Sequence, residues 1–218
     1  MARIVFDLDG TLIDSARDIH ALANRVLATV DAPPITLAQT RQFVGNGAPT
    51  FVERMCRASG VGPEDGHQVL SLFLDGYSGA VDLTEVYPNV PAVLDQLLAH
   101  GHSLGICTNK PLAPARAVLD HVGLLPYFTV VIGGDSLPTV KPDPAPLVKA
   151  FADLGAGPTI FVGDSDVDAE TAKRAGVPFL LFAEGYSRTK LDDLPSAAVF
   201  DDFNDLPRLI QTCLERGG

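Results

Sequence analysis

The feature of this sequence that most constrains its fold is an alternation of short apolar segments with helical segments. The helical segments begin near Asn89, Pro111, Pro146 and Ser165, and glycines follow their last turns. Strand–helix alternation of this length predicts an α/β fold, a Rossmann-like parallel sheet with helices on both faces. The apolar segments expected to form its strands are residues 4–8, 104–107, 130–132, 160–162, 179–182 and 199–200.

One long region interrupts the alternation. Between Ser15 and Asp82 the apolar residues follow helical spacing, and no segment favours a strand. Thr36 and Gln39 have the spacing of a capping box at a helix start. We therefore expect an α-helical cap domain, residues 15–82, inserted after the first strand of a core domain that comprises residues 1–14 and 83–218.

The charge and the cysteines limit the partners and the location that we expect. The 218 residues carry a formal net charge of −11 without a Lys/Arg run, so we expect no nucleic-acid partner. A small anionic substrate is still compatible, because local groups decide its binding. Three scattered cysteines without zinc spacing, no signal-peptide pattern and no apolar run of membrane length favour a cytoplasmic protein without a membrane partner. We expect a monomer or homodimer.

The first apolar segment runs directly into two acids. Ile4, Val5 and Phe6 precede Asp7, and Asp9 and Gly10 follow it. A buried carboxylate is costly without a partner, and the two-residue period of a strand points Asp7 and Asp9 toward the same side. Taken alone, this pattern favours an ordinary strand end with an Asp-Gly turn.

Two later strand ends carry groups suited to an anion. Thr108 and Asn109 follow the second predicted strand of the core and precede a helix start at Pro111, where free backbone N–H groups favour phosphate. Lys141 lies in a proline-rich stretch that follows the third strand and restricts the backbone there. Each signal alone is also typical of an ordinary turn or a solvated loop.

The segment "GDSDVDAE" follows the fourth strand and is rich in carboxylates. Asp164, Asp166 and Asp168 alternate as in an EF-hand, but Ala169 and Ala175 stand where that loop needs glycine and glutamate. The remaining interpretation is a divalent-metal site with Asp164 as a ligand and Asp168 one helical turn further along.

Taken together, these signals favour one site over independent coincidences. Ligands of open α/β sheets bind beyond the carboxyl ends of the strands, so neighbouring strands would bring the groups into one crevice. A cation would balance the acids, and a cation with a lysine suits a phosphoryl group.

In this order and spacing, the motifs resemble those of the haloacid-dehalogenase-like phosphatases over almost the whole chain. "DLDGT" is similar to the first motif, Thr108 to the second, Lys141 to the third and "GDSDVD" to the fourth. Within that family, "VGNGAPTFVERM", "CTNKP" and "EGY" look like segments of the bacterial phosphoglycolate phosphatases.

The resemblance implies a role for each matching residue. Asp7 would be the nucleophile that forms an aspartyl-phosphate, ionised at neutral pH without a base, and Asp9 the general acid and base. Mg²⁺ would be held by Asp7, Asp164 and the backbone carbonyl of Asp9, with Asp168 orienting a metal-bound water or Lys141. Thr108 and the Asn109 backbone would bind phosphate oxygens, and Lys141 would offset charge between the phosphate and Asp7.

The implied substrate is a small phosphorylated metabolite, and 2-phosphoglycolate fits best. We expect Gly45, Asn46 and Gly47 in the cap, with Arg17 and Arg41 as further candidates, to meet its carboxylate. The alternatives are a sugar-phosphate mutase, a phosphatase of broad specificity for small phosphomonoesters, or a non-enzymatic phospho-acceptor module.

Overall fold

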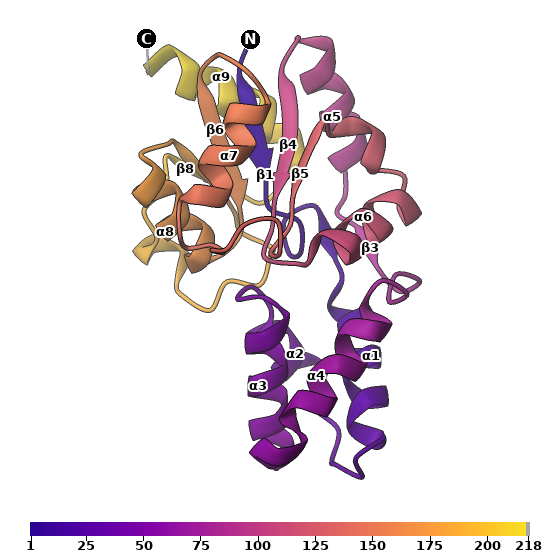
Figure 1. The fold of residues 1–218 in the computed structure, drawn as a ribbon. Helices are drawn as coiled ribbons and strands as arrows, with labels where there is room; N and C mark the ends of the chain where they lie inside the picture. The colour runs from indigo at the N-terminus through magenta and orange to yellow at the C-terminus, as the bar shows by residue number, and fades with distance from the viewer. Residues whose placement is uncertain (217–218) are drawn as a thin grey trace.

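The computed structural model describes residues 1–216, which form a parallel sheet with its helices and, beyond one end of that sheet, a group of four helices (Figure 1). The six-stranded sheet has the order β5-β4-β1-β6-β7-β8, so β1 lies between β4 and β6. Every predicted strand is present, although the first ends at Phe6 rather than at residue 8. The strands are β1 (Arg3–Phe6), β4 (Ser103–Cys107), β5 (Val130–Ile132), β6 (Thr159–Gly163), β7 (Phe179–Phe182) and β8 (Ala198–Phe200).

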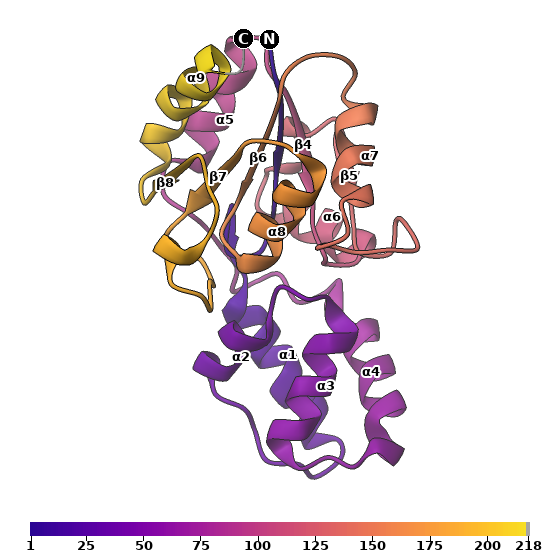
Figure 2. The ribbon, with the colours of Figure 1, turned by 90° about the vertical axis from the view of Figure 1, so that its left-hand side faces the viewer.

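Helices cover both faces of the sheet (Figure 2), because the strands present apolar side chains to both faces. Ile4 and Phe6 of β1 share a core with α5 (Val90–Ala99), α6 (Leu112–His121) and α9 (Leu206–Arg216). Val5 belongs to the core on the other face, with α7 (Ala145–Asp153) and α8 (Asp166–Ala175). The predicted α/β fold class is thus confirmed. Short 3₁₀ turns cover Leu125–Tyr127, Leu191–Asp193 and Phe203–Asp205.

The helix boundaries follow the local signals in most places. Ser165 caps α8 through a capping box with Asp168, and Gly176 ends that helix in the left-handed conformation. The helix near Asn89 begins as expected, but Asn89 has φ 67° and its side chain does not cap the helix, as its residue type would suggest. Its amide instead donates to Asp202 at 3.1 Å, and the proline at the start of α5 needs no partner for a backbone N–H.

The interrupting region forms four helices with an apolar core of their own. They are α1 (Ala16–Ala28), α2 (Leu37–Phe43), α3 (Ala48–Ser59) and α4 (Pro63–Tyr77). The Phe73 ring lies 5.2 Å from Phe51 and 4.9 Å from Tyr77, centroid to centroid, in the middle of this core. The predicted capping box of Thr36 and Gln39 opens α2.

A two-stranded antiparallel ribbon, which the sequence analysis missed, connects the helical cap to the sheet. Its strands, β2 (Ile13–Asp14) and β3 (Glu85–Val86), are too short to show an alternating pattern. In α1, Asp18 accepts hydrogen bonds from the Leu83 backbone and the Thr84 hydroxyl, at 2.9 and 2.7 Å. Both chain crossings between cap and core are therefore fixed to each other and to α1.

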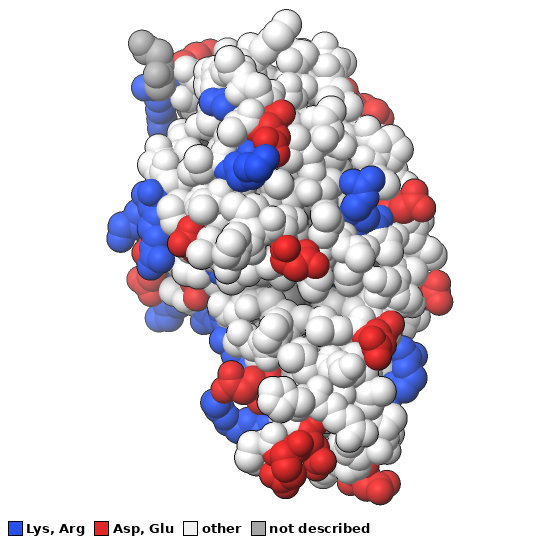
Figure 3. Space-filling model, in the orientation of Figure 1, with Lys and Arg blue, Asp and Glu red and all other residues white. Residues whose placement is uncertain are grey.

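The carboxyl ends of the strands point toward the cap (Figure 1), so groups that follow β1, β4 and β6 lie at the junction. Figure 3 shows that the charged side chains on one face form small groups, many of them mixed in sign, separated by uncharged surface. Within residues 1–216, no helix is both long and apolar enough to cross a membrane.

A pair of leucine substitutions tests the placement of the core. Leu104 in β4 is fully buried, whereas Leu98 on α5 is 40% exposed. We expect Leu104→Ala to lower the free energy of unfolding by about 2–5 kcal/mol, because it removes buried methyl groups and leaves a cavity. Leu98→Ala should change it by less than about 1 kcal/mol. Denaturant unfolding of both variants gives the comparison, and equal losses would contradict the assigned core.

Candidate active site

The end of β1 places Asp7 and Asp9 at the junction of sheet and cap. The Asp7 backbone N–H donates to the Val162 carbonyl of β6 at 2.9 Å, which continues the sheet by one more bond. Gly10 then turns the chain with φ 91°, a conformation that favours glycine. Asp7 and Asp9 are 7% and 9% exposed, and each belongs to a different group of charges.

Asp7 belongs to a buried acidic cluster. One carboxylate oxygen from each of Asp7, Asp164 and Asp168 lies within 4.8 Å of the others. The Lys141 ammonium lies 2.9 Å from Asp7 Oδ1 and 2.6 Å from Asp168 Oδ1. Three of the four predicted strand ends thus meet in this cluster, since Asp7 follows β1, the two other acids follow β6, and Lys141 lies in the segment after β5. One lysine faces three carboxylates, so the cluster carries excess negative charge.

The pKa values reflect this excess. Burial raises the pKa of Asp7 to about 7, with a further increase from Asp168 that Lys141 opposes. Burial and the Asp168 and Asp7 carboxylates also hold the pKa of Asp164 well above its usual range. Burial and the Asp168 carboxylate thus act against the expected ionisation of Asp7 at neutral pH. A cation bound here would favour the ionised form.

The donor set of the cluster fits a hard divalent cation. Asp164 accepts from the Thr11 hydroxyl and the Tyr186 backbone N–H, both at 2.7 Å, which orients its carboxylate. Asp168 accepts from Lys141 through one oxygen and from Ser165 through the other. Oxygen atoms are the ligands that Mg²⁺ prefers. Asp7 and Asp164 have carboxylates available for it, and the bonds of Asp168 suit an orienting role.

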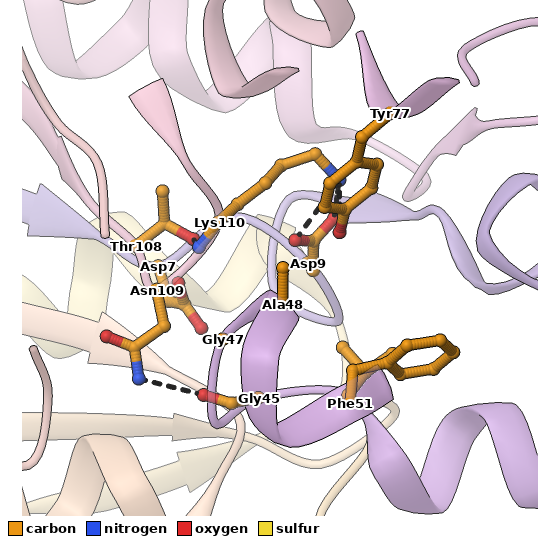
Figure 4. A pocket seen from close by; sticks show the side chains of 11 residues that line it. Asp7, Asp9, Gly45, Gly47, Ala48, Phe51, Tyr77, Thr108, Asn109 and Lys110 are labelled. Atoms are coloured by element: carbon orange, nitrogen blue, oxygen red, sulfur yellow. Dashed lines mark hydrogen bonds and ion pairs between the residues drawn. The ribbon is translucent and has the colours of Figure 1, made fainter. Parts of the chain in front are cut away.

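Asp9 faces a different partner. Its carboxylate accepts from the Ser15 hydroxyl and from Lys110, whose Nζ lies 3.1 Å from Oδ1 and 3.4 Å from Oδ2 (Figure 4). Lys110 also donates to the Tyr77 hydroxyl at 3.2 Å. Burial lowers the pKa of Lys110, but Asp9 and Tyr77 raise it by more, so the ammonium stays charged.

The sequence analysis missed Ser15 and Lys110 as partners of Asp9, and Tyr77 as a partner of Lys110. Lys110 directly follows Thr108 and Asn109 at the strand end, so its position was a usable signal. Tyr77 is the last residue of α4, and nothing local indicates that the cap brings its ring to the core.

A small pocket lies between these residues and the cap. Its cavity of about 30 Å³ has room for one or two water molecules. Residues of core and cap both contribute to its wall, so the pocket lies at the junction of the two. The wall consists of Asp7, Asp9, Val44, Gly45, Gly47, Ala48, Phe51, Tyr77, Thr108, Asn109 and Lys110.

Asn109 links the cap to the core through its side chain. Its Nδ2 donates to the Gly45 carbonyl at 2.9 Å (Figure 4). The same Nδ2 donates to the Lys141 carbonyl at 2.9 Å, and Oδ1 accepts from the Lys141 backbone N–H. Gly45 and Gly47 have φ values of 109° and 86°, so this loop needs glycine at both positions. Thr108 is buried beside them, and its Oγ1 accepts from the Lys110 backbone N–H.

The other cap residues expected to bind the substrate carboxylate lie outside the pocket wall, unlike Gly45 and Gly47. Asn46 is not among the residues that line the pocket. Arg17 forms an exposed ion pair with Glu85 at 3.0 Å, and Arg41 pairs with Asp14 at 2.8 Å. Each arginine thus pairs with an acid of the ribbon that connects the cap to the sheet, and neither lines the pocket.

Gly10 gives a test of the acidic cluster. A Cβ at Gly10 would lie 2.5 Å from Asp164 Oδ2, whereas Gly176, also at positive φ, has no atom within 4 Å of such a Cβ. We expect Gly10→Ala to displace Asp164 and to weaken divalent-cation binding at least about tenfold, because a strained contact pushes a ligand away. Gly176→Ala should lose only stability. Mg²⁺-dependent shifts of the melting temperature measure both, and unchanged binding in Gly10→Ala would contradict this geometry.

Comparison with known proteins agrees with this geometry. Residues 4–182 match the family model of the haloacid dehalogenase-like hydrolases. The chain is 44% identical to the phosphoglycolate phosphatase of a strain of Cereibacter sphaeroides, over 98% of this chain and 100% of the relative. It is also 44% identical to the phosphoglycolate phosphatase of Rhodobacter capsulatus, over 95% of this chain and 96% of the relative.

Solved structures include a similar fold. The crystal structure of a predicted phosphoglycolate phosphatase from Haemophilus somnus superimposes with a TM-score of 0.89 at 31% identity, covering 95% of this chain and 97% of that one. A family match over most of the sequence and full-length relatives lead to the same assignment. The chain belongs to the haloacid dehalogenase-like hydrolase family.

Proposed function

We propose that this protein is a Mg²⁺-dependent phosphomonoester hydrolase that works through an aspartyl-phosphate, with 2-phosphoglycolate as its substrate. The observation that carries the proposal is the buried Asp7 carboxylate. Asp7 lines the pocket, and behind the pocket wall it contacts Lys141 and belongs to a cluster with Asp164. Mg²⁺ held by Asp7, Asp164 and the Asp9 carbonyl would neutralise the phosphate oxygens and favour ionised Asp7.

Asp7 is the nucleophile of the first step. Its oxygen attacks phosphorus, the bond from phosphorus to the leaving oxygen breaks, and the phosphoryl group is then covalently bound to Asp7. Thr108 and the backbone at Asn109 bind phosphate oxygens on one side. Lys141 supplies positive charge between Asp7 and the phosphate, and Asp168 holds Lys141 in place at 2.6 Å.

Asp9 transfers the proton in both steps. It gives a proton to the leaving oxygen in the first step and takes one from water in the second, when that water releases phosphate from Asp7. Ser15 and Lys110 hold the carboxylate in one orientation, so its position does not depend on the substrate.

The substrate assignment rests on the named relatives and on the cap. Two relatives named phosphoglycolate phosphatase are 44% identical to this chain over almost its full length. The loop Gly45–Gly47 lines the pocket, and its glycines let backbone groups approach an anion closely. A mutase would return the phosphoryl group to a sugar, so product analysis with hexose phosphates separates it from a hydrolase.

The proposal also assigns separate functions to two domains and places the protein in the cytoplasm. Residues 15–82 form a cap domain that opens to admit substrate and closes to exclude water, over a core domain of residues 1–14 and 83–218. The free thiols of Cys56, Cys107 and Cys213 suit the cytoplasm.

Replacing the nucleophile tests the chemistry. We expect Asp7→Asn to abolish hydrolysis of 2-phosphoglycolate, to below about 10⁻³ of the wild-type kcat, because an amide cannot form the acyl-phosphate. The matched control is Asp166→Asn, whose side chain is 38% exposed and outside the cluster. It should keep wild-type activity. Steady-state kinetics with circular dichroism of both variants decide, and a normal rate in Asp7→Asn would remove Asp7 from this role.

Chelation tests the metal. We expect EDTA to eliminate activity and Mg²⁺ to restore it, because three carboxylates share one lysine. Asp164→Ala should raise the Mg²⁺ concentration for half-maximal activity at least about tenfold. Asp166→Ala, which changes an acid on the same loop, should leave it unchanged. Full activity in chelator would contradict the metal site and leave the nucleophile to be judged separately.

A further inference from the structure

We propose that Lys110 binds a second anionic group of the substrate, one attached to the carbon that carries the leaving oxygen. This inference rests on the proposed function, because it uses Asp9 as the group that protonates the leaving oxygen. Lys110 would then distinguish one phosphomonoester from another. The residues that bind the phosphate cannot do so, because every phosphomonoester carries the same phosphate group.

Charge in the pocket singles out this lysine. Among the described residues that line the pocket, Lys110 is the only cation. Lys141 is not part of that wall, and Asp7 and Asp168 already engage its ammonium at 2.9 and 2.6 Å. A substrate that carries an anion besides its phosphate would bring that charge into a nearly water-free site, where an unpaired charge is costly. Lys110 is the group that can pair with it.

The position of Lys110 relative to Asp9 fixes which anion it reaches. The ammonium lies 3.1 Å from Asp9 Oδ1 and 3.4 Å from Oδ2. Asp9 in turn contacts the leaving oxygen when it donates its proton. The atoms beside Lys110 are therefore those attached to the leaving-group carbon, and anions further along a longer leaving group lie out of reach.

The ammonium is held in place and has a donor to spare. The side chain of Lys110 is 1% exposed, and its Nζ lies 4.3 Å from the centre of the Tyr77 ring and 3.2 Å from the Tyr77 hydroxyl. An ammonium has three N–H donors. One N–H can serve both Asp9 oxygens, at 3.1 and 3.4 Å, and a second serves the Tyr77 hydroxyl, which leaves the third for a substrate carboxylate. Because Lys110 is already ordered, binding costs little further side-chain entropy.

Two substrates that differ only in this anion test the proposal. In 2-phosphoglycolate a carboxylate occupies the place of the methyl group of ethyl phosphate, and the leaving oxygen is the same. The measured quantity is the ratio of kcat/KM for 2-phosphoglycolate to kcat/KM for ethyl phosphate. We expect Lys110→Met to lower this ratio about 10- to 100-fold, the effect of one lost hydrogen bond to a charged group.

Further variants separate recognition from folding. Lys149→Met makes the same change at a half-exposed lysine on α7, which pairs with Asp153, and should leave the ratio unchanged. Tyr77→Phe keeps the ring and removes the hydroxyl, so we expect it to lower the ratio severalfold. If Lys110→Met does not fold by circular dichroism, Lys110→Gln, which keeps a donor without the charge, takes its place with a fall of about tenfold.

The outcomes distinguish this inference from the proposed function. If both substrates lose the same factor in the Lys110 variants, Lys110 acts only through Asp9; the inference is then overturned while the phosphatase assignment stands. Equal kcat/KM for the two substrates in the wild type also overturns it. If the wild type hydrolyses neither substrate, the proposed function itself fails.

Discussion

The contact on which the rest of this structure depends is the buried ammonium of Lys141 between Asp7 and Asp168. It joins Asp7, at the end of β1, to Asp168 in α8, the helix that follows β6. The order of the strands in the sheet therefore determines which residues meet in the site. Breaking such a pair leaves an uncompensated buried charge, which typically costs about 3–5 kcal/mol. Asn109 accepts from the Lys141 backbone and donates to Gly45, so the position of the cap depends on the same lysine.

Asp164 and Asp168 have partners of different charge although they lie one helical turn apart. Both oxygens of each carboxylate accept hydrogen bonds, but Asp168 has the Lys141 ammonium among its partners, whereas the Thr11 hydroxyl and the Tyr186 backbone N–H that bind Asp164 are neutral. The capping box of α8 is thus also part of the site, because the residue that caps the helix orients an acid of the cluster. The Ser165 and Asp168 side chains thus both begin α8 and position a carboxylate of the acidic cluster.

The sequence predicted the parts of the fold that depend on local pattern. The strands from Arg3 to Phe200 are continuous apolar runs, and a parallel sheet requires such runs. Their order explains why groups distant in sequence converge, as the motifs at Asp7, Lys141 and Asp164 indicated. The ribbon of β2 and β3 escaped prediction because two-residue strands have no period. Tyr77 escaped because its role depends on how the cap docks, and Arg17 and Arg41 have ion-pair partners that no spacing reveals.

The paired crossings of β2 and β3 have a consequence for the kinetics of the cap. In the proposed opening of the cap, two hydrogen-bonded strands would restrict the cap to rotation about a short axis, whereas two flexible linkers would allow many orientations. After such an opening, a stiff connection would keep the cap residues that line the pocket at a high effective concentration relative to the core. In the proposed cycle, the ribbon would therefore tie the rate of substrate admission to local bending at Ile13–Asp14 and Glu85–Val86, and Ile13 is itself bridged to Asp9.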